Sequence, residues 1–481
     1  MRTLVWFRGK DLRLTDHAPL LDALERGEAI PIFVVDPHFF APERAKEMPH
    51  RMQFLVESLA ELATAIEARG SRLLFAHGKS VVVVPELAHA FGAERVVAHR
   101  WSEPFGIERD RRVASALTRG GSRLELFEGE TLAVPGQVLT GSGTPFAVFT
   151  PFSRAFVKAV TIGQPRPAPK TLPPLPPLPA AVKKLLGDAP TLASIGVVRN
   201  EHLVTGGEQA ARARIATFMK DAAAKYDEGR NAMGVHGTSR ISQDLKFGTL
   251  SARSAWQAAR RGLDDHPKAW RTFANQLVWR EFAYDVLRGR PEVLERPFRA
   301  AWERFPWRKD SAAWSAWVEG RTGYPVVDAA ARQLLGEGFV HNRARMIAAS
   351  FLCKHLLIDV RLGEAHYMKY LTDGDWALND LGWQWSAGCG VDAQPWFRVF
   401  NPVTQGERFD ADGAYVRRWV PELARVPARW LHSPWLMPPL ELRALGVSYP
   451  APIVDHALAR GRFLAAAEGH LRPAGGAPTK A

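Results

Sequence analysis

Short apolar runs alternate with segments of helical spacing over the first 130 residues. Between the runs, residues 52–70 repeat apolar side chains at helical spacing and end on Gly70, a residue that helix ends favour. Strand–helix alternation of this kind predicts a parallel sheet with helices on both faces, and therefore an α/β domain over 1–130. The runs that predict strands are rich in β-branched and aromatic residues and span 3–7, 29–36, 71–78, 95–101 and 122–130.

A proline-rich tract interrupts this alternation. Residues 163–179, GQPRPAPKTLPPLPPLP, cannot form a helix or a central strand, because proline lacks the backbone donor. An extended connector is expected there, and a ligand for a proline-recognition module is the alternative. We therefore place an interdomain linker at 131–197. Helical spacing then dominates and predicts an all-α domain over 198–470, followed by a frayed tail at 471–481.

The length of the chain predicts two domains, and its net charge predicts a polyanionic partner. A chain of 481 residues exceeds one ordinary core, so two domains are expected. The 63 basic and 50 acidic residues leave a net charge of +13, which favours nucleic acid as a partner. A generally basic proteome is the alternative explanation of this charge.

Cysteine usage and hydropathy exclude several classes of protein. The two cysteines, Cys353 and Cys389, form no C-x-x-C motif, so neither a disulfide framework nor a metal site is expected. The N-terminus lacks the apolar stretch of a signal peptide, and no run of about 18 apolar residues is present. We therefore expect a cytoplasmic protein with no membrane partner.

One predicted helix carries an amide, an indole and a guanidinium on a single face. In FANQLVWREFAYDVL (273–287), helical spacing aligns Gln276, Trp279 and Arg280. Such a face suits a stacked, hydrogen-bonded ligand such as a nucleobase. The alternative is a tryptophan at a domain seam beside an arginine in a salt bridge.

Two further segments could meet anions. GFVHNRARMIAASFLCKHLL (338–357) predicts a largely buried helix whose two arginines need anionic partners, either phosphates or carboxylates such as Asp373. His341 is interpreted there as a structural histidine. In GTSRISQDLKFGTLSARSAW (237–256), Thr238 and Ser239 could cap a helix and direct backbone N–H groups at an anion, or act as caps alone. Ser251 is expected to cap the helix that follows.

The stretch DGDWALNDLGWQW (373–385) combines three indoles with carboxylates and an amide. Asn379, between Trp376 and Trp383, could offer its amide to a planar heterocycle, while neighbouring indoles could pass electrons between a buried site and solvent. A redox-active aromatic cofactor would explain both features. A plain aromatic core would explain the indoles but not the carboxylates.

Seven motifs together resemble the photolyase/cryptochrome family, in order and with the family's spacing. The resemblance runs from Trp6 to about residue 435 and is closest to the class I-type cyclobutane pyrimidine dimer photolyases. The motifs are WFRGKDLRLTDH (6–17), GTSRIS (237–242), WREF (279–282), GRTGYPVVDAAARQL (320–334), HNRARM (341–346), DGDWALNDLGWQW and AQPWFRVFNPVTQG (393–406).

The resemblance implies an α/β antenna domain, a wrapping linker and a helical domain that holds FAD. In the family, the photoexcited, fully reduced flavin donates an electron to a flipped-out pyrimidine dimer in DNA, the cyclobutane ring splits, and the electron returns. The chain is therefore expected to be a monomeric, light-driven DNA repair enzyme. A cryptochrome-like blue-light photoreceptor without repair activity is the alternative.

The resemblance also implies site residues. Arg345 and Asp373 resemble the family's ion pair beside the flavin ring, Asn379 the residue that faces flavin N5, and Trp383 and Trp307 the two ends of its electron relay. The cofactor-binding positions implied are Tyr226, Thr238, Ser239, Arg240, Ile241, Ser242, Arg345, Asp373, Asp375 and Asn379. The DNA- and lesion-contact positions implied are Arg230, Gln276, Trp279, Arg280, Asn342, Arg343, Met346, Trp385 and Arg398.

Three departures from the family pattern matter. Gln276 stands where dimer-splitting enzymes usually have glutamate; it also occurs in the (6-4) branch, which however has two histidines where this chain has Asn342 and Met346. We therefore expect dimer repair. The middle relay position is Val360, so another aromatic residue must substitute, with Trp376 as a guess. The antenna ligand could be a folate, a deazaflavin or a flavin, with Glu108 and Arg51 as candidate contacts, or the antenna site could be empty.

Overall fold

The computed structural model describes residues 1–471, so all but the first residue of the expected tail at 471–481 lie outside the described residues. The chain forms two compact units. The first unit contains Met1–Ala224, Ser239–Pro291 and Thr372–Asp375; the second contains Lys225–Thr238, Glu292–Leu371 and the residues from Trp376 onward. The domain boundaries expected from the sequence stay a prediction.

The first unit is built on a five-stranded parallel sheet, as its sequence pattern predicts. The order is β3-β2-β1-β4-β5, so the chain starts in the middle of the sheet and builds outward to both edges. The strands are β1 (Arg2–Phe7), β2 (Glu28–Val35), β3 (Leu74–His77), β4 (Arg95–His99) and β5 (Arg123–Phe127).

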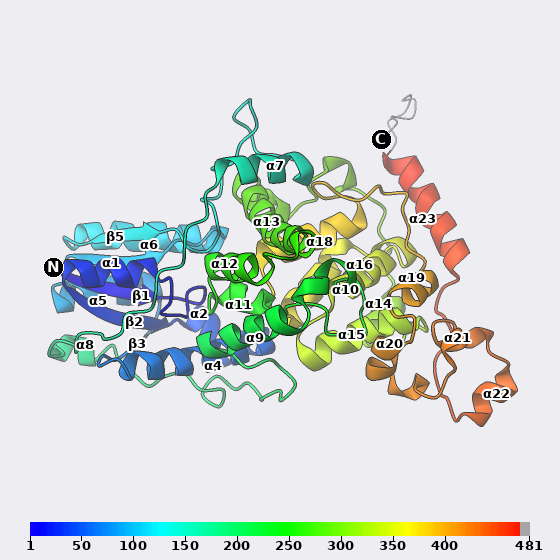
Figure 1. The fold of residues 1–481 in the computed structure, drawn as a ribbon, viewed down its shortest axis with the longest axis horizontal. Coiled ribbons are helices and arrows are strands. Elements are labelled where there is room, and N and C mark those ends of the chain that lie inside the picture. Colours follow the sequence, from blue (N-terminus) through cyan, green and yellow to red (C-terminus); the bar gives the residue numbers. More distant parts are fainter. Residues whose placement is uncertain (472–481) are drawn as a thin grey trace. The chain divides into compact units, whose positions relative to one another are not determined.

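Alternate side chains of β1 point into two separate apolar layers, as the pleat of a strand requires. Val5 and Phe7 pack with residues of α1 (Ala18–Arg26) and α4 (Pro49–Glu67). Leu4 and Trp6 pack on the other face with residues of α5 (Ser80–Phe91) and α6 (Pro104–Arg119). Both faces of the sheet are therefore covered by helices (Figure 1), which confirms the expected α/β class.

The first unit continues into helices beyond the sheet. Ser251 caps α12 by accepting a hydrogen bond from the backbone N–H of Ser254 at 3.0 Å, as its position in the sequence predicts. The remaining helices of this unit are α2 (Pro37–Phe40), α3 (Pro42–Ala45), α7 (Phe149–Ala159), α8 (Ala180–Lys183), α9 (Glu208–Asp221), η1 (Ala223–Lys225, whose last residue belongs to the second unit), α11 (Ser242–Phe247), α12 (Ala252–Gly262) and α13 (Pro267–Gly289).

The proline-rich tract is extended and lies on the first unit. Residues 163–179 contain no helix or strand. Leu172 is 6% exposed, and its backbone N–H donates to the carbonyl of Arg69 at 2.7 Å. The prolines therefore produce the extended conformation that the sequence predicts for this tract.

The second unit is helical around one apolar core. That core includes Trp317 and Trp383, which are 2% and 4% exposed. No described helix is both long and apolar enough to span a bilayer. The elements are α10 (Tyr226–Gly229), η2 (Pro291–Leu294, whose first residue belongs to the first unit), η3 (Ala300–Trp302), α14 (Ser311–Val318), α15 (Pro325–Glu337), α16 (Asn342–Ser350), the π-helical turn η4 (Phe351–His355), α17 (Val360–Tyr370), α18 (Trp376–Ala387), α19 (Pro402–Phe409), α20 (Ala414–Trp419), η5 (Pro421–Leu423), α21 (Ala428–Leu431), η6 (Pro434–Leu436), α22 (Pro439–Ala444) and α23 (His456–Leu471).

Candidate functional site

The residues expected to bind the flavin are divided between the two units. Each group is described within its own unit. Ser239, Arg240, Ile241, Ser242, Asp373 and Asp375 belong to the first unit, and Tyr226, Thr238, Arg345 and Asn379 belong to the second.

The segment 237–242 does not form the helix cap that its hydroxyl residues suggest. Helix α11 begins only at Ser242, and its N-cap residue is Ile241, which has no side-chain capping bond. Arg240 adopts a left-handed backbone conformation with φ of 49°, which stops a helix from starting at Thr238 or Ser239. The capping interpretation of Thr238 and Ser239 is therefore wrong, although both residues keep half-buried hydroxyls.

Asp375 lies in a buried set of charged and hydroxyl side chains, which we call the carboxylate network: Lys10, Glu103, Glu130, Tyr284 and Asp375. The Tyr284 hydroxyl is 2.6 Å from Asp375 Oδ2 and 3.1 Å from Glu130 Oε1. Lys10 Nζ is 2.8 Å from Glu103 Oε1 and 3.7 Å from Asp375 Oδ2, and it also pairs with Glu130. One lysine thus holds three buried carboxylates.

The network fixes a negative charge on Asp375. Burial alone would raise the pKa of Asp375, but Lys10 and Lys246, followed by the Tyr284 hydrogen bond and Arg280, outweigh burial and lower the pKa to about 2. Lys10 stays charged, since its three carboxylate neighbours and Tyr284 outweigh burial and raise its pKa. This network could not be expected from the sequence, because its members are far apart along the chain.

Arg280 belongs to the surroundings of this network. Its side chain is buried, with an exposure of 4%, and its guanidinium lies 4.7 Å from the ring centre of Tyr284. The helical spacing that places Arg280 beside Gln276 and Trp279 gives no information on its burial. A DNA contact for Arg280 stays a prediction. Within the first unit, its guanidinium is surrounded by side chains of the protein, such as Tyr284.

Asn379 is fixed in the second unit by a hydrogen bond between two helices. Its Nδ2 on α18 donates to the backbone carbonyl of Glu364 on α17 at 3.2 Å, and the side chain is buried. Because the amide nitrogen is the group engaged there, Oδ1 remains as an acceptor. Burial, and then the charge of Asp380, raise the pKa of the Glu364 carboxyl to about 9, so that carboxyl is neutral at pH 7.

Two buried hydroxyls test whether the chain fits a polar cofactor. Thr372, directly before Asp373, is 3% exposed, and its Oγ1 has no hydrogen-bond partner among the described residues. The buried hydroxyl of Tyr367 in the second unit also has no partner within the described chain. Unsatisfied buried hydroxyls are costly in a folded protein. The ribityl and phosphate oxygens of FAD are groups that would satisfy them, so these residues fit FAD.

Trp383 begins a chain of aromatic side chains in the second unit. Its ring centre is 5.0 Å from that of Tyr367 and 6.0 Å from that of Trp317. Gly363 on α17 makes this packing possible, because a Cβ at residue 363 would overlap the Trp383 ring. Trp317 in turn lies 5.6 Å from Trp314.

The other residues considered for the relay lie elsewhere. Trp307 packs with Phe305 at 4.5 Å and with Trp302 at 6.0 Å. Among the described residues, no ring contact joins this group to Trp383. Trp376 is 42% exposed, and no ring contact involves it within the described chain. The relay ends expected at Trp383 and Trp307 stay predictions.

The helix α13 presents Gln276 and Trp279 as half-buried side chains. The Trp279 indole is stacked on Phe149 of α7, with ring centres 3.8 Å apart and planes 8° apart. Gln276 Nε2 donates to the Thr272 carbonyl at 3.3 Å, and its amide oxygen is not engaged in that contact. Phe149 therefore braces one face of the Trp279 indole and fixes its orientation.

Helix α16 carries three of the expected lesion and DNA contacts. Asn342 is exposed, Arg343 and Met346 are half-buried, and Asn342 Nδ2 is 3.7 Å from Met346 Sδ. His341 precedes them as the N-cap and accepts from the Arg343 backbone N–H at 3.1 Å, so its structural role is confirmed. Trp385 is half-buried on α18.

Three arginines gather near the start of this helix. Arg343 Nη2 donates to Asn231 Oδ1 at 2.8 Å, and its guanidinium lies 4.2 Å from the ring centre of Phe409. Burial, followed by the like charges of Arg230 and Arg408, lowers the pKa of Arg343. Such a cluster of cations favours an anion such as phosphate. Arg408 on α19 was not expected from the sequence, because Glu407 and Asp410 flank it and hide a local excess of basic charge.

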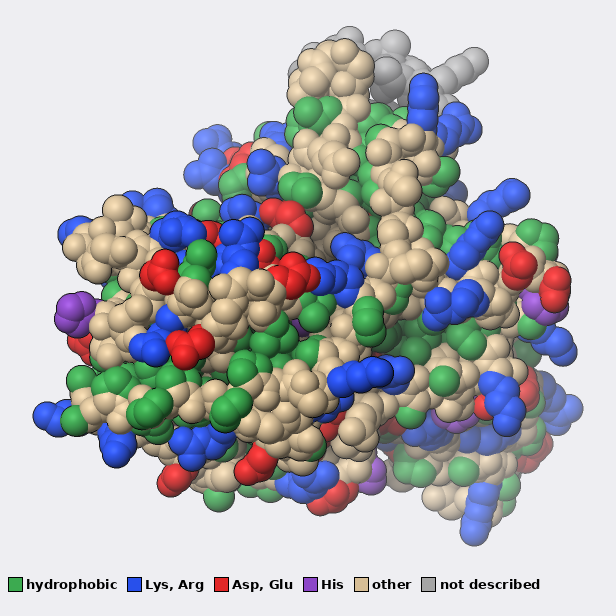
Figure 2. Space-filling model, turned by 60° about the vertical axis from the view of Figure 1, so that its left-hand side comes forward, with side chains coloured by type: hydrophobic (Ala, Val, Ile, Leu, Met, Phe, Trp, Pro, Cys, Tyr) green, Lys and Arg blue, Asp and Glu red, His purple; other side chains and the backbone are tan. Residues whose placement is uncertain are grey.

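Positive charge is also spread more widely. Arg398 is exposed. On the face drawn in Figure 2, lysine and arginine side chains are scattered over the surface with acidic side chains among them. The net charge of +13 is therefore not gathered into one patch on that face.

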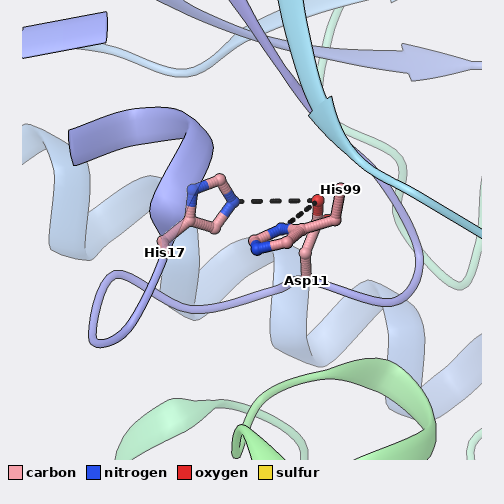
Figure 3. Close-up of side chains that lie close together, drawn as sticks. All are labelled: Asp11, His17 and His99. Carbon is pink, nitrogen blue, oxygen red and sulfur yellow. Dashed lines mark hydrogen bonds and ion pairs between the residues drawn. The ribbon is translucent and has the colours of Figure 1, made fainter. Parts of the chain in front are cut away.

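Asp11, His17 and His99 form a buried group with the residue types and spacing of a metal site (Figure 3). Asp11 Oδ2 is 3.3 Å from His99 Nδ1 and 3.7 Å from His17 Nε2. However, His17 Nδ1 accepts the Leu20 backbone N–H at 3.1 Å, so the proton of the neutral ring must be on Nε2, which faces Asp11. This tautomer directs an N–H toward the Asp11 carboxylate, although 3.7 Å is too long for a hydrogen bond, and it opposes a metal at Nε2.

The triad keeps both imidazoles neutral. Burial lowers the pKa of His99 to about 3 and also lowers the pKa of His17. Burial alone would raise the pKa of Asp11, but the interactions with His17 and His99 outweigh it and hold that pKa well below its ordinary value. The triad thereby ties the loop after β1 to β4 and to the start of α1.

The two antenna candidates have different surroundings. Burial lowers the pKa of Arg51 to about 10, although the nearby charges of Glu103 and Asp375 act to raise it. Glu108 is exposed and pairs with Arg111 at 2.8 Å on the surface of α6. Within the first unit, Arg51 therefore belongs beside the carboxylate network, whereas Glu108 does not.

Comparisons with known proteins place this chain in a family. Residues 3–174 match the family described as DNA photolyase, and residues 273–469 match the FAD binding domain of DNA photolyase. The deoxyribodipyrimidine photo-lyase of Agrobacterium fabrum is 40% identical over 474 residues, which cover 96% of this chain and 97% of that relative.

Two solved structures are similar over almost the whole chain. A bacterial class III photolyase from Agrobacterium tumefaciens has a TM-score of 0.90 at 38% identity and covers 98% of both chains. A cryptochrome from Synechocystis sp. has a TM-score of 0.87 at 32% identity and covers 96% of this chain and 99% of its own. The chain therefore belongs to the photolyase/cryptochrome family, as a DNA photolyase-type enzyme with an FAD-binding domain.

Proposed function

We propose that the protein repairs cyclobutane pyrimidine dimers in DNA, with an electron passing from photoexcited, reduced FAD to a flipped-out dimer. The observation that carries this choice of lesion is the pair Asn342 and Met346 on α16. An amide and a thioether can bind a base by hydrogen bonding and dispersion, but neither can transfer a proton at pH 7. Splitting a cyclobutane ring by one electron needs no net proton transfer.

Helix α13 supports recognition of an extruded base. Trp279, braced by Phe149, offers a fixed aromatic face, and base–aromatic stacking contributes about 1–3 kcal/mol per base. Gln276, one turn before it, offers an amide oxygen and a remaining N–H to the edge of the base. We propose Trp385 on α18 as the second indole in contact with the dimer.

The flavin supplies the light absorption and the electron, and the chain holds it and sets its surroundings. Asn379 presents Oδ1 as an acceptor, which suits a ring nitrogen that carries a proton more than one that does not. Asp375, kept ionised by the carboxylate network, provides a fixed negative charge at its proposed contact with the cofactor.

Arginine side chains give affinity for the DNA backbone without a choice of sequence. We propose phosphate contacts for Arg230, Arg343, Arg398 and Arg408, because contacts of this kind position a duplex but do not read its bases. Binding is then expected to weaken as salt rises. The partner is DNA that contains pyrimidine dimers, and the acting species is a monomer.

A repair assay tests this proposal. Chemically reduced protein is mixed with an oligonucleotide that carries one thymine cyclobutane dimer and is then exposed to blue light. Dark samples and a (6-4) photoproduct substrate are run in parallel. Recovery of thymine absorbance in light with the dimer alone is the expected result. Gln276→Glu is run beside the wild type, and a higher repair yield in that variant would show that the amide limits the reaction.

The alternative is a photoreceptor that binds FAD and does not repair. The similarity to a Synechocystis cryptochrome keeps this alternative open. Absence of repair by FAD-loaded protein in both light and dark would favour the photoreceptor and reject the repair proposal. The second chromophore, whether folate, deazaflavin or flavin, is a separate matter that this assay does not address.

A further inference from the structure

The position between the two expected relay tryptophans is Val360, an aliphatic side chain on α17 that is 3% exposed. An aliphatic residue cannot be oxidised by its neighbours, so a relay through this position is interrupted. Trp383 nevertheless contacts another indole, because the ring centre of Trp317 lies 6.0 Å away. Trp317 continues to Trp314 at 5.6 Å, with the two ring planes only 25° apart.

We propose that Trp383, Trp317 and Trp314 form the electron relay through which the protein brings its own flavin to the reduced state in light. This inference rests on the proposed function, since it takes Trp383 as the indole beside the flavin. It replaces the expected route through residue 360 and Trp307. It also assigns a role to α14, which carries Trp314 and Trp317 one turn apart.

The first two indoles, Trp383 and Trp317, are buried, and the last, Trp314, is partly exposed. A relay that moves positive charge outward to solvent needs this order. Trp383 and Trp317 are 4% and 2% exposed, so water cannot take a proton from either indole when it is oxidised. The Trp317 indole N–H donates to the Ala348 carbonyl at 3.2 Å, which fixes the ring and retains its proton. Trp314 is only partly buried, and it is the first indole of the series from which water can take the Nε1 proton.

His366 packs against both outer indoles. Its ring centre lies 5.7 Å from Trp317 and 5.8 Å from Trp314. Burial, followed by the charge of Lys369, lowers the pKa of His366 to about 4, so the imidazole is neutral at pH 7. It therefore adds no positive charge to oppose a positive indole beside it.

The other aromatic neighbour is a poorer relay residue. Tyr367 lies 5.0 Å from Trp383, but tyrosine loses its phenolic proton when it is oxidised. Its side chain is buried, so water cannot take that proton. Burial also raises the pKa of Tyr367. Tryptophan can carry the charge as a radical cation without releasing a proton, so the route through Trp317 is favoured.

One electron passes along the relay in each turn. Oxidised FAD, when bound and excited by light, would accept one electron from the indole of Trp383, which becomes a radical cation; two such turns and one proton from water would bring the flavin to the fully reduced state. Trp317 then reduces Trp383, and Trp314 reduces Trp317, so the positive charge moves outward by two steps. Trp314 releases its Nε1 proton to water, and a thiol in solution returns one electron and one proton to it. Over two turns the thiol is the net reductant: a dithiol is oxidised to its disulfide, two electrons reach FAD, and no bond of the protein is changed at the end.

The test compares single variants in the full-length protein loaded with oxidised FAD. Blue light is applied with dithiothreitol, and flavin reduction is followed by absorbance. A laser flash in a second experiment records the transient absorbance of tryptophan radicals. Trp317→Phe is expected to lose photoreduction to the level of Trp383→Phe, and its long-lived radical signal should disappear.

Trp302→Phe is the matched control. Trp302 is 2% exposed, as Trp317 is, and it stacks on Phe305 at 4.8 Å within the separate group around Trp307. Its replacement should leave photoreduction at the wild-type rate. FAD content and melting temperature are measured for each variant. If Trp317→Phe fails to hold FAD, Trp314→Phe at the partly exposed end must show the loss of photoreduction instead.

Other outcomes would overturn the relay. Wild-type photoreduction in FAD-loaded Trp317→Phe would reject it, whatever the result for Trp314→Phe. Loss in Trp307→Phe, with normal rates in Trp317→Phe, would return the route to Trp307. The repair assay on the wild type is independent: repair without a Trp317 effect rejects the relay alone, and a Trp317 effect without repair rejects the proposed function alone.

Discussion

The carboxylate network of the first unit and the tryptophan series of the second are both buried, but they handle charge in opposite ways. The network holds permanent charges, and Lys10 compensates Glu103, Glu130 and Asp375 together. The tryptophan series is neutral at rest and acquires charge only briefly. Permanent buried charge makes each member depend on its partners, whereas a neutral series can lose one member and keep its fold. Stability should therefore be sensitive in the first region and light-driven electron transfer in the second.

The largest expected effect on stability is that of Lys10→Met. This change leaves three buried carboxylates without their shared cation, and breaking a buried ion pair on one side typically costs about 3–5 kcal/mol. The free energy of unfolding in urea measures it. Arg111→Met, at an exposed ion pair, should leave that free energy nearly unchanged. Equal effects of the two changes would contradict the role given to the network.

Acid should weaken the first unit through the Asp11–His17–His99 triad. The folded state holds the pKa of His99 near 3, while the unfolded chain takes up that proton below about pH 6.5. The unfolded state therefore binds more protons between these values, and stability falls as the pH decreases through this range, by up to about 1.4 kcal/mol per pH unit for each such histidine.

Comparing the wild type with His99→Asn isolates the contribution of His99 to this loss of stability in acid. An asparagine can still donate to Asp11 but does not titrate. Unfolding free energies are measured from pH 7 to pH 4 for both proteins. The wild type should lose more stability than His99→Asn over this range. Parallel curves would mean that His99 is not held neutral.

Tyr284→Phe should have a smaller effect within the same network. It removes a donor that lies 2.6 Å from Asp375, and loss of a hydrogen bond to a buried charge costs about 1–3 kcal/mol. Tyr324→Phe is the control, because that hydroxyl donates at 2.9 Å to the neutral carbonyl of Val454. A larger loss for Tyr284→Phe is expected in urea unfolding. The reverse order would argue against an ionised Asp375.

The smallest expected effect on stability is that of Trp314→Phe in the tryptophan series. The side chain is partly buried and bears no charge, so the unfolding free energy should fall by less than about 1 kcal/mol. The melting temperature would then change little while photoreduction is lost. A loss as large as that of Lys10→Met would remove the distinction between the two regions.

The local features of the fold were predictable where a pattern repeats along the chain. Five strands and their parallel arrangement follow from apolar runs, and the cap at Ser251 follows from a hydroxyl before a helical segment. The cap proposed at Thr238 and Ser239 was wrong, because the left-handed conformation of Arg240 delays helix α11 and cannot be seen in composition.

The site was less predictable because it depends on contacts between distant residues. Lys10, Glu130 and Tyr284 meet Asp375 only after folding, and each alone is an ordinary polar residue. The burial of Arg280 was missed for the same reason. Trp314 and Trp317 carried a usable signal, since indoles three residues apart share a helix face, but nothing in the sequence connects that face to Trp383.

Gly363 has a consequence for the construction of chimeric proteins. The Trp383 ring occupies the space that a side chain at residue 363 would need, so the two residues are compatible only as a pair. A recombination point between α17 and α18 could join a larger residue at 363 to a tryptophan at 383, and the two would collide. Chimeras of this chain with its relatives should therefore keep both helices from one parent.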